Sequence, residues 1–407
     1  MKQTYRFARY LACAGLIAGT LSLWGCGSAS TFDPINTTTT RIVAFGDALV
    51  DVGQVGRLNA ALTKYRYTVN NVVAGATTNT SNTFIEYLSS YFGFGSVAYA
   101  LDNLAAGRLP STGAYSYGEF GALVSGAAGT TDARGCTKVV STLTQRTNGT
   151  AVANAYCAYN LQAQIDLFLA QGSPTSTDLF VISIGTGDIM ATGIRNLTID
   201  AVTTPVTFAA GLGAVQTDLA TAGVSTTMQA AANALAVQVK RLTDAGAKYV
   251  LVVGPPNVGR SPWATTTGNA TLFQNLSYNT GSGVISMGSE GLARIQATFG
   301  NKTNNPVLFV EISGLVNTLT DGGNTVFANK ASVCTATAAT LTSVTASSIG
   351  TGVAAPGQLS AALCTTATLG GDQSTFVYAD GVNFTPAMQS QFYSQALARM
   401  RLAAWID

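Results

Sequence analysis

The sequence lacks histidine and has few charged residues. None of its 407 residues is histidine, which removes the most common general base, the most common metal ligand and the side chain that titrates near neutral pH. Charged residues make up 10% of the chain and the formal net charge is +2, whereas about a quarter of an average protein is charged. This balance offers no basic surface to nucleic acid, so we expect no nucleic-acid partner.

The first residues have the layout of a secretory signal. Lys2, Arg6 and Arg9 precede an apolar run that ends at Cys26, which is the typical order of the charged and apolar signal regions. The run is short for a spanning helix, and no stop-transfer flank follows it. "LWGC" resembles a bacterial lipobox, which makes Cys26 the expected lipidation site; an ordinary signal cut near "GSAS" is the alternative. We expect an exported chain, either a lipoprotein anchored to the outer membrane or an extracellular protein of a bacterium.

Composition divides the chain into a signal, a tether and one domain. Residues 1–25 form the expected signal peptide, and residues 26–40 form a flexible tether rich in Ser and Thr. Residues 41–407 form a single domain with a low-complexity insertion at about 330–375. We find no repeat of fixed period and no second core pattern. A monomer without a cofactor is expected.

Four cysteines lie beyond the signal: Cys136, Cys157, Cys334 and Cys364. An exported chain favours disulfides, and four cysteines allow three pairings. The local pairs Cys136–Cys157 and Cys334–Cys364 are favoured, because each would close one segment rich in Thr, Ser and Gly. A zinc site is the weaker alternative, since the chain has no CxxC pair and no histidine. We therefore expect no metal.

Apolar runs of strand length alternate with amphipathic helical patterns. The expected strands are 41–46, 178–185, 248–254 and 306–312. The expected helices are 82–93, 160–172, 225–246 and 385–406. Strands that are apolar throughout and separated by such helices predict an α/β fold, a three-layer α/β/α sandwich with a mostly parallel sheet. Functional groups of these folds gather in the loops after the carboxyl ends of the strands.

Five segments resemble, in order, the motif blocks of the GDSL esterases and lipases, also called SGNH hydrolases. They are "VAFGDALVDVG", "YSYGEFGALV", "FVISIGTGDI", "VLVVGPPNVGRSP" and "FVYADGVNFTPAMQ". The chain is most similar to secreted bacterial members with an insertion before the last block. The resemblance implies a flavodoxin-like fold and a hydrolase acting on carboxylic esters. The matched positions are Gly46, Asp47, Leu49, Gly121, Gly185, Asp188, Asp380, Thr385 and Pro386.

The catalytic residues of that family are replaced. In the family a serine attacks the ester, a histidine takes its proton, and an asparagine side chain and a glycine amide help to stabilise the oxyanion. Here the serine position holds Ala48, the histidine position Asn383 and the asparagine position Gly187. A methyl group cannot attack, and an amide has no basic nitrogen. The orienting acid Asp380 and the oxyanion glycine Gly121 are retained.

These replacements predict an inactive exported pseudoenzyme that binds a small acyl-ester or acetylated-carbohydrate ligand. The alternatives are a slow carboxyl-ester hydrolase with non-standard groups around Gly121 and Asp380, and a structural envelope protein. Deliberate knockout of an active enzyme is disfavoured, because histidine is absent everywhere. The candidate binding residues are Asp47, Asp188 and Phe120. The two carboxylates could serve acid–base or cation chemistry, but bracing of their own turns is favoured, and Phe120 could narrow the pocket.

Overall fold

The computed structural model describes part of the chain. That part comprises residues 38–53, 66–71, 81–103, 107–124, 146–147, 150–151, 159–193, 222–266, 268–279, 286–300, 305–334, 361, 364–366 and 369–407. All of them belong to one compact unit, Pro34–Asp407. The predicted signal peptide, the lipidation site Cys26, the pair Cys136–Cys157 and most of the predicted insertion lie outside the described residues.

A parallel sheet forms the centre of this unit. Its strands are β1 (Arg41–Gly46), β2 (Ala98–Tyr99), β3 (Gly113–Ser116), β6 (Asp178–Ser183), β7 (Tyr249–Val253) and β8 (Val307–Val310). They lie in the order β2-β3-β1-β6-β7-β8, and every neighbouring pair is parallel. Without the two-residue edge strand β2, the chain order across the sheet is 2-1-3-4-5, that of flavodoxin-like folds. The direction of winding reverses between β1 and β6, which is where such sheets bind ligands.

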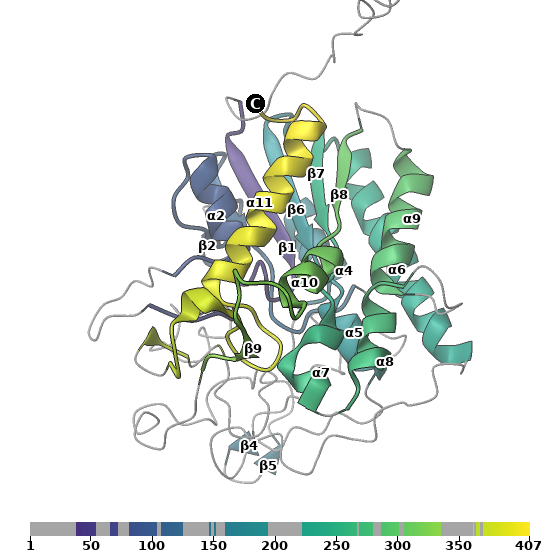
Figure 1. The fold of residues 1–407 in the computed structure, drawn as a ribbon. Helices are drawn as coiled ribbons and strands as arrows, with labels where there is room; N and C mark the ends of the chain where they lie inside the picture. Colours follow the sequence, from purple (N-terminus) through teal and green to yellow (C-terminus); the bar gives the residue numbers. More distant parts are fainter. Residues whose placement is uncertain are drawn as a thin grey trace, which may run out of the picture. The chain divides into compact units, whose positions relative to one another are not determined.

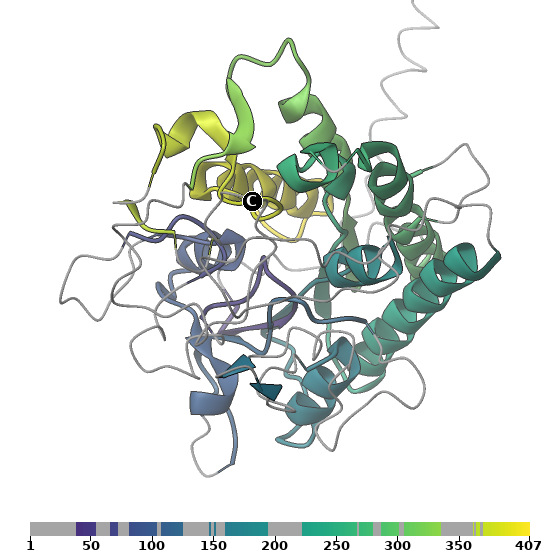
Figure 2. The same ribbon diagram turned by 90° about the horizontal axis from the view of Figure 1, so that it is seen from below.

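Helices cover both faces of the sheet. They are α2 (Phe84–Tyr91), α4 (Leu161–Leu169), α5 (Thr186–Gly193), α6 (Ala222–Asp244), α7 (Pro262–Thr266), α8 (Ala270–Ser277), α9 (Met287–Phe299), α10 (Ser313–Thr320) and α11 (Pro386–Leu402). Helices α4, α6 and α9 pack on one face, whereas α2 and α11 pack together on the other (Figures 1 and 2). The predicted fold class, a mostly parallel sheet between two layers of helices, is confirmed.

The four predicted strands are present in the central sheet, and two further strands of this sheet were missed. β1, β6, β7 and β8 consist of fully buried residues, as their continuous apolar patterns predict. The missed strands β2 and β3 have two and four residues, too few for a recognisable pattern. β3 pairs in register with the start of β1, so its conformation depends on that neighbour.

The two ends of the predicted insertion at about 330–375 are joined by a disulfide and by a small second sheet. The structure contains the predicted disulfide Cys334–Cys364. β9 (Asn329–Ser332) pairs in parallel with β10 (Phe376–Tyr378), so the start of the predicted insertion is ordered as a strand. A further pair of short strands, β4 (Arg146–Thr147) and β5 (Thr150–Ala151), is antiparallel. Helix α11 then begins at Pro386, and the hydroxyl of the N-cap residue Thr385 accepts from the Met388 N–H.

Candidate active site

The first motif block forms a tight turn at the carboxyl end of β1. Gly46 has a φ of +135°, and a Cβ atom there would lie 1.7 Å from the carbonyl oxygen of Ser183. Only glycine fits this close approach of β1 to β6. From α4, the buried Gln164 side chain accepts from the Gly46 N–H at 2.7 Å and donates to its carbonyl at 3.0 Å. This turn places Ala48, half-buried, beside the sheet edge.

Gly187, at the asparagine position, lies against the turn of the second block. A Cβ atom at Gly187 would lie 2.5 Å from the carbonyl oxygen of Ala122 and 3.2 Å from that of Gly121. Real Cβ atoms essentially never come within 3.0 Å of another heavy atom, so an asparagine would need the turn to move. The backbone of the second block therefore lies in the space that a side chain at position 187 would occupy.

Asp47 and Asp188 are buried carboxylates that brace the neighbouring loops. Asp47 accepts from the Thr186 N–H at 3.2 Å, and Asp188 accepts from the Val124 N–H at 3.1 Å. Burial raises the pKa of Asp47 to about 7, although bonds from the backbone and hydroxyl of Thr186 and from the Leu49 N–H lower it. Burial also raises the pKa of Asp188 to about 7, and the charge of Asp47 raises it further. Burial therefore favours the protonated form of both carboxyls well above the pH at which an exposed aspartate loses its proton.

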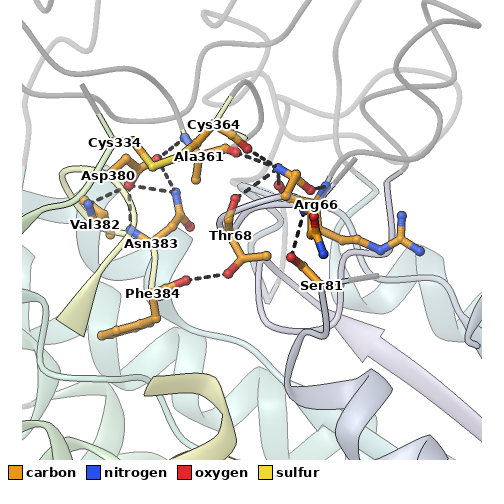
Figure 3. Close-up of a disulfide and its surroundings, with 12 residues drawn as sticks. Arg66, Thr68, Ser81, Cys334, Ala361, Cys364, Asp380, Val382, Asn383 and Phe384 are labelled. Atoms are coloured by element: carbon orange, nitrogen blue, oxygen red, sulfur yellow. Dashed lines mark hydrogen bonds between the residues drawn. A yellow bond between two sulfur atoms is a disulfide. The ribbon is translucent and has the colours of Figure 1, made fainter. Parts of the chain in front are cut away.

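The fifth block pairs Asn383 with Asp380 (Figure 3). The amide nitrogen of Asn383 lies 2.9 and 3.1 Å from the two carboxylate oxygens of Asp380. Asp380 is fully buried and also accepts from the backbone N–H groups of Ala361, Val382 and Asn383. Burial raises the pKa of Asp380, against the lowering effect of these bonds. Asn383 keeps the donor toward the acid that an imidazole would provide, but it supplies no proton acceptor of comparable basicity.

The segment 67–70, which lies outside the motif blocks, contacts both the second and the fifth block. The Tyr67 ring stacks on that of Phe120, with centroids 3.9 Å apart, and the Thr68 hydroxyl donates to the Phe384 carbonyl at 2.8 Å. The Asn70 amide donates to the carbonyls of Ala361 and Cys364 at 2.9 and 3.0 Å. Figure 3 shows this segment beside the disulfide and the Asp380–Asn383 pair. Sequence reasoning missed these residues, because no periodicity or motif marks them.

Two further contacts bind the motif blocks to one another. Asp51, a fully buried residue in the first block, accepts from the Phe120 N–H at 2.7 Å. After β7, the backbone N–H of Trp263 donates to the Gly381 carbonyl at 3.0 Å. The end of the fourth block therefore lies beside the fifth block. The loops after β1, β3 and β6 therefore contact one another, and the segment after β7 contacts the fifth block, at the edge of the sheet where α5 and α7 also lie (Figure 1).

The described residues contain no cluster of three or more His, Cys, Asp or Glu side chains suited to a metal ion. Of the described helices, none combines the length and apolar character needed to cross a membrane. Neither the models of known protein families nor the curated proteins include a match to this chain. The parallel sheet and its strand order are compatible with an SGNH hydrolase, whereas membership of that family remains a prediction from the five motif blocks.

Proposed function

We propose that this chain is an exported GDSL-like protein that binds an acyl-ester or acetylated-carbohydrate ligand without hydrolysing it. The observation that carries the proposal is the Asp380–Asn383 pair. The acid of the motif is kept, buried and fully bonded, while the residue that should act as base directs its amide N–H groups at that acid. The scaffold of the motif is therefore maintained around a group that cannot take a proton.

The size of the chemical loss supports this proposal. Removal of the nucleophile or the base of a serine protease lowers kcat by about a million-fold, and removal of both is hardly worse. Oxyanion donors and substrate binding alone retain roughly a thousand-fold over water. Here Ala48 and Asn383 replace both groups, and no histidine exists elsewhere in the chain to substitute for the base. The position of the site at the winding reversal between β1 and β6 favours retention of a ligand there.

Slow ester hydrolysis is the second candidate, and one contact favours it. The Thr186 N–H donates to Asp47 at 3.2 Å, and burial raises the pKa of this carboxyl to about 7. Thr186 is half-buried and begins α5, next to the first block. A threonine hydroxyl beside a carboxyl group with such a raised pKa provides the components of a weak nucleophile and base pair. Thr186→Val would remove any rate that depends on this pair.

A ligand-binding experiment tests the proposal. The full chain is titrated with ethyl butyrate and with an acetylated xylo-oligosaccharide while its melting temperature is followed, and the ester is assayed afterwards by NMR. The proposal predicts a saturable rise for at least one probe, an intact ester and loss of the rise in Ala48→Leu, which fills the nucleophile position. No rise with any ester would reject the binding role and leave the structural envelope protein as the better account.

Export is tested separately at the N-terminus. We infer from the signal layout that Cys26 is the first residue of the mature chain and carries lipid. Mass spectrometry of the mature N-terminus should give a diacylated or triacylated cysteine. An unmodified N-terminus in the segment 27–30 would instead indicate an ordinary signal cut and an extracellular protein.

A further inference from the structure

A cavity of about 170 Å³ lies at the opposite edge of the sheet, where the strands begin. Its inner wall is formed by Arg41 at the start of β1, Leu109 before β3 and Phe168 near the end of α4. Arg108 and Gln171 lie closer to its mouth. None of the five motif blocks contributes a lining residue, so this cavity is separate from the site described above.

The cavity carries one positive charge that no acidic lining residue neutralises. The Arg41 guanidinium is held by Asp178, with Nε–Oδ1 and Nη2–Oδ2 distances of 3.0 and 2.5 Å. The charge of Arg41 is therefore neutralised by Asp178, which does not line the cavity. Arg108 is exposed and forms no ion pair within the described part of the chain, and no Asp or Glu lines the cavity. The lining thus favours an anion.

The polar groups at the mouth can donate hydrogen bonds. The Gln171 side-chain oxygen already accepts from the Tyr117 hydroxyl at 2.9 Å, which directs its amide nitrogen, a double donor, elsewhere. Ser111, Ser173 and Thr175 add hydroxyl groups to the lining. Together with the Arg108 guanidinium, these groups offer the donors that a carboxylate requires.

The C-terminal end of α4 lies at the cavity and would repel an anion, because a helix C-terminus carries partial negative charge. Three of its last carbonyls are already bonded, however. The oxygens of Asp166, Phe168 and Leu169 accept from the N–H groups of the three residues that follow the helix, 170–172. This capping weakens the negative end of the helix at the cavity, and the full charge of Arg108 outweighs what remains.

The inner wall suits a compact apolar group. Leu109 and Phe168 are buried, and the Arg41 guanidinium carbon lies 5.7 Å from the centre of the Phe168 ring. The volume of about 170 Å³ leaves room for a single small ring or a short alkyl chain. The cavity therefore combines an apolar body site with a cationic mouth.

We propose that this cavity binds a small carboxylate with an aryl or short alkyl body. The body lies against Leu109 and Phe168, while the carboxylate faces Arg108 and the Gln171 amide. This site is independent of the function proposed for the motif blocks, because it shares no residue with them.

Benzoate and its neutral analogue benzamide test the proposal by calorimetric titration of the full chain. Benzoate should bind saturably, and benzamide about tenfold more weakly or worse, because it lacks the charge that pairs with Arg108. Arg108→Gln should weaken benzoate binding about tenfold, and Arg108→Lys should recover part of the loss. The matched control Arg399→Gln removes the same charge from the exposed face of α11 and should leave binding unchanged.

The proposal would be overturned by no saturable binding of benzoate, by equal binding of benzamide, or by equal losses in Arg108→Gln and Arg399→Gln. The location of the bound benzoate is checked with two variants, Ser173→Phe at the cavity and Ala48→Leu at the motif edge, the edge of the sheet at which the five motif blocks lie. The first should block benzoate and the second should not. Benzoate binding that is lost only in Ala48→Leu would assign the ligand to the motif edge, contradicting this site without bearing on the function proposed there.

Discussion

The two edges of the sheet use their polar residues differently. At the carboxyl edge, Asp51 and Asp380 are fully buried and bonded to backbone N–H groups. At the amino edge, Arg41 and Asp178 neutralise each other behind a cavity, and the exposed Arg108 at its mouth has no ion-pair partner among the described residues. The same two strands, β1 and β6, contribute to both edges.

The same fold therefore uses its polar side chains in two ways. At the carboxyl edge, acidic and amide side chains hold the loops in place through hydrogen bonds to backbone groups. Polar residues there now stabilise the arrangement of the loops. At the amino edge, the polar residues line a cavity that is open to solvent. The five motif blocks thus lie at the edge where the polar side chains are paired, whereas Arg108, which has no ion-pair partner among the described residues, lies at the other edge.

Removal of the disulfide should have the largest effect on the carboxyl edge. Cys334 and Cys364 are separated by 30 positions, and in the chain-entropy model closing a loop of that length stabilises a protein by about 3–4 kcal/mol. The double variant Cys334→Ser, Cys364→Ser should lose this amount in urea unfolding. Exchange of the Ala361 N–H, which bonds to Asp380, should accelerate. A loss below about 1 kcal/mol would mean that the Asn70 bonds suffice to hold the segment.

The pH dependence of stability reports on the buried carboxylates of the same edge. In the native state Asp47 and Asp188 have a pKa of about 7, above their ordinary value of 3.8. Between those values the native chain holds protons that the unfolded chain has released. Stability is therefore greatest below about pH 4 for these groups and falls as pH rises toward 7, by up to about 1.4 kcal/mol per pH unit for each group.

The absence of histidine makes this measurement clean, since no other side chain ordinarily titrates between pH 5 and 8 except a free thiol. Burial also raises the pKa of Glu311 and Asp380, which act in the same direction. Asp47→Asn should flatten the fall, whereas Asp244→Asn, on the exposed end of α6, should leave it unchanged. A stability that rises from pH 5 to pH 7 would contradict the burial of these carboxyls.

Gly187→Asn tests whether the space of the oxyanion side chain is filled. Its Cβ would lie 2.5 Å from the Ala122 carbonyl oxygen, and overpacking of this kind destabilises by about 1–3 kcal/mol. Thermal unfolding should show that loss. Gly322→Asn is the matched control, because nothing lies within 4 Å of a Cβ at Gly322. Equal stabilities of the two variants would mean that the second-block turn moves aside freely.

Phe120→Leu should give the smallest effect at this edge. The Phe120 ring stacks on Tyr67, and an aromatic pair contributes about 0.5–1.5 kcal/mol beyond the area it buries. The variant should lose about 1 kcal/mol in urea unfolding. A Phe120→Leu chain of unchanged stability that loses its ester ligand would instead make Phe120 a binding residue.

Much of the fold follows from local sequence, whereas the state of the site does not. The continuous apolar runs of β1, β6, β7 and β8 need no partner to be recognised. β3 was missed because its four residues take their conformation from pairing with β1. The motif blocks predict which loops share an edge, because parallel strands end together.

The details of the site depend on contacts between distant residues. The Ala122 carbonyl lies next to Gly187, 65 positions later in the chain, and Thr68 bonds to Phe384. No periodicity in either segment specifies such a contact. The amino-edge cavity arises in the same way, since Arg41, Arg108 and Phe168 come from three separate segments.

Hydrolysis of nitrophenyl butyrate decides between an inactive chain and a slow esterase. The native chain is compared with buffer and with the double variant Ala48→Ser, Asn383→His, which restores nucleophile and base but leaves Gly187 in place because an asparagine does not fit there. We predict that the native chain hydrolyses the ester at the buffer rate and that the double variant exceeds it. A native chain that hydrolyses the ester far above the buffer rate, and loses that rate in Thr186→Val, would contradict the account.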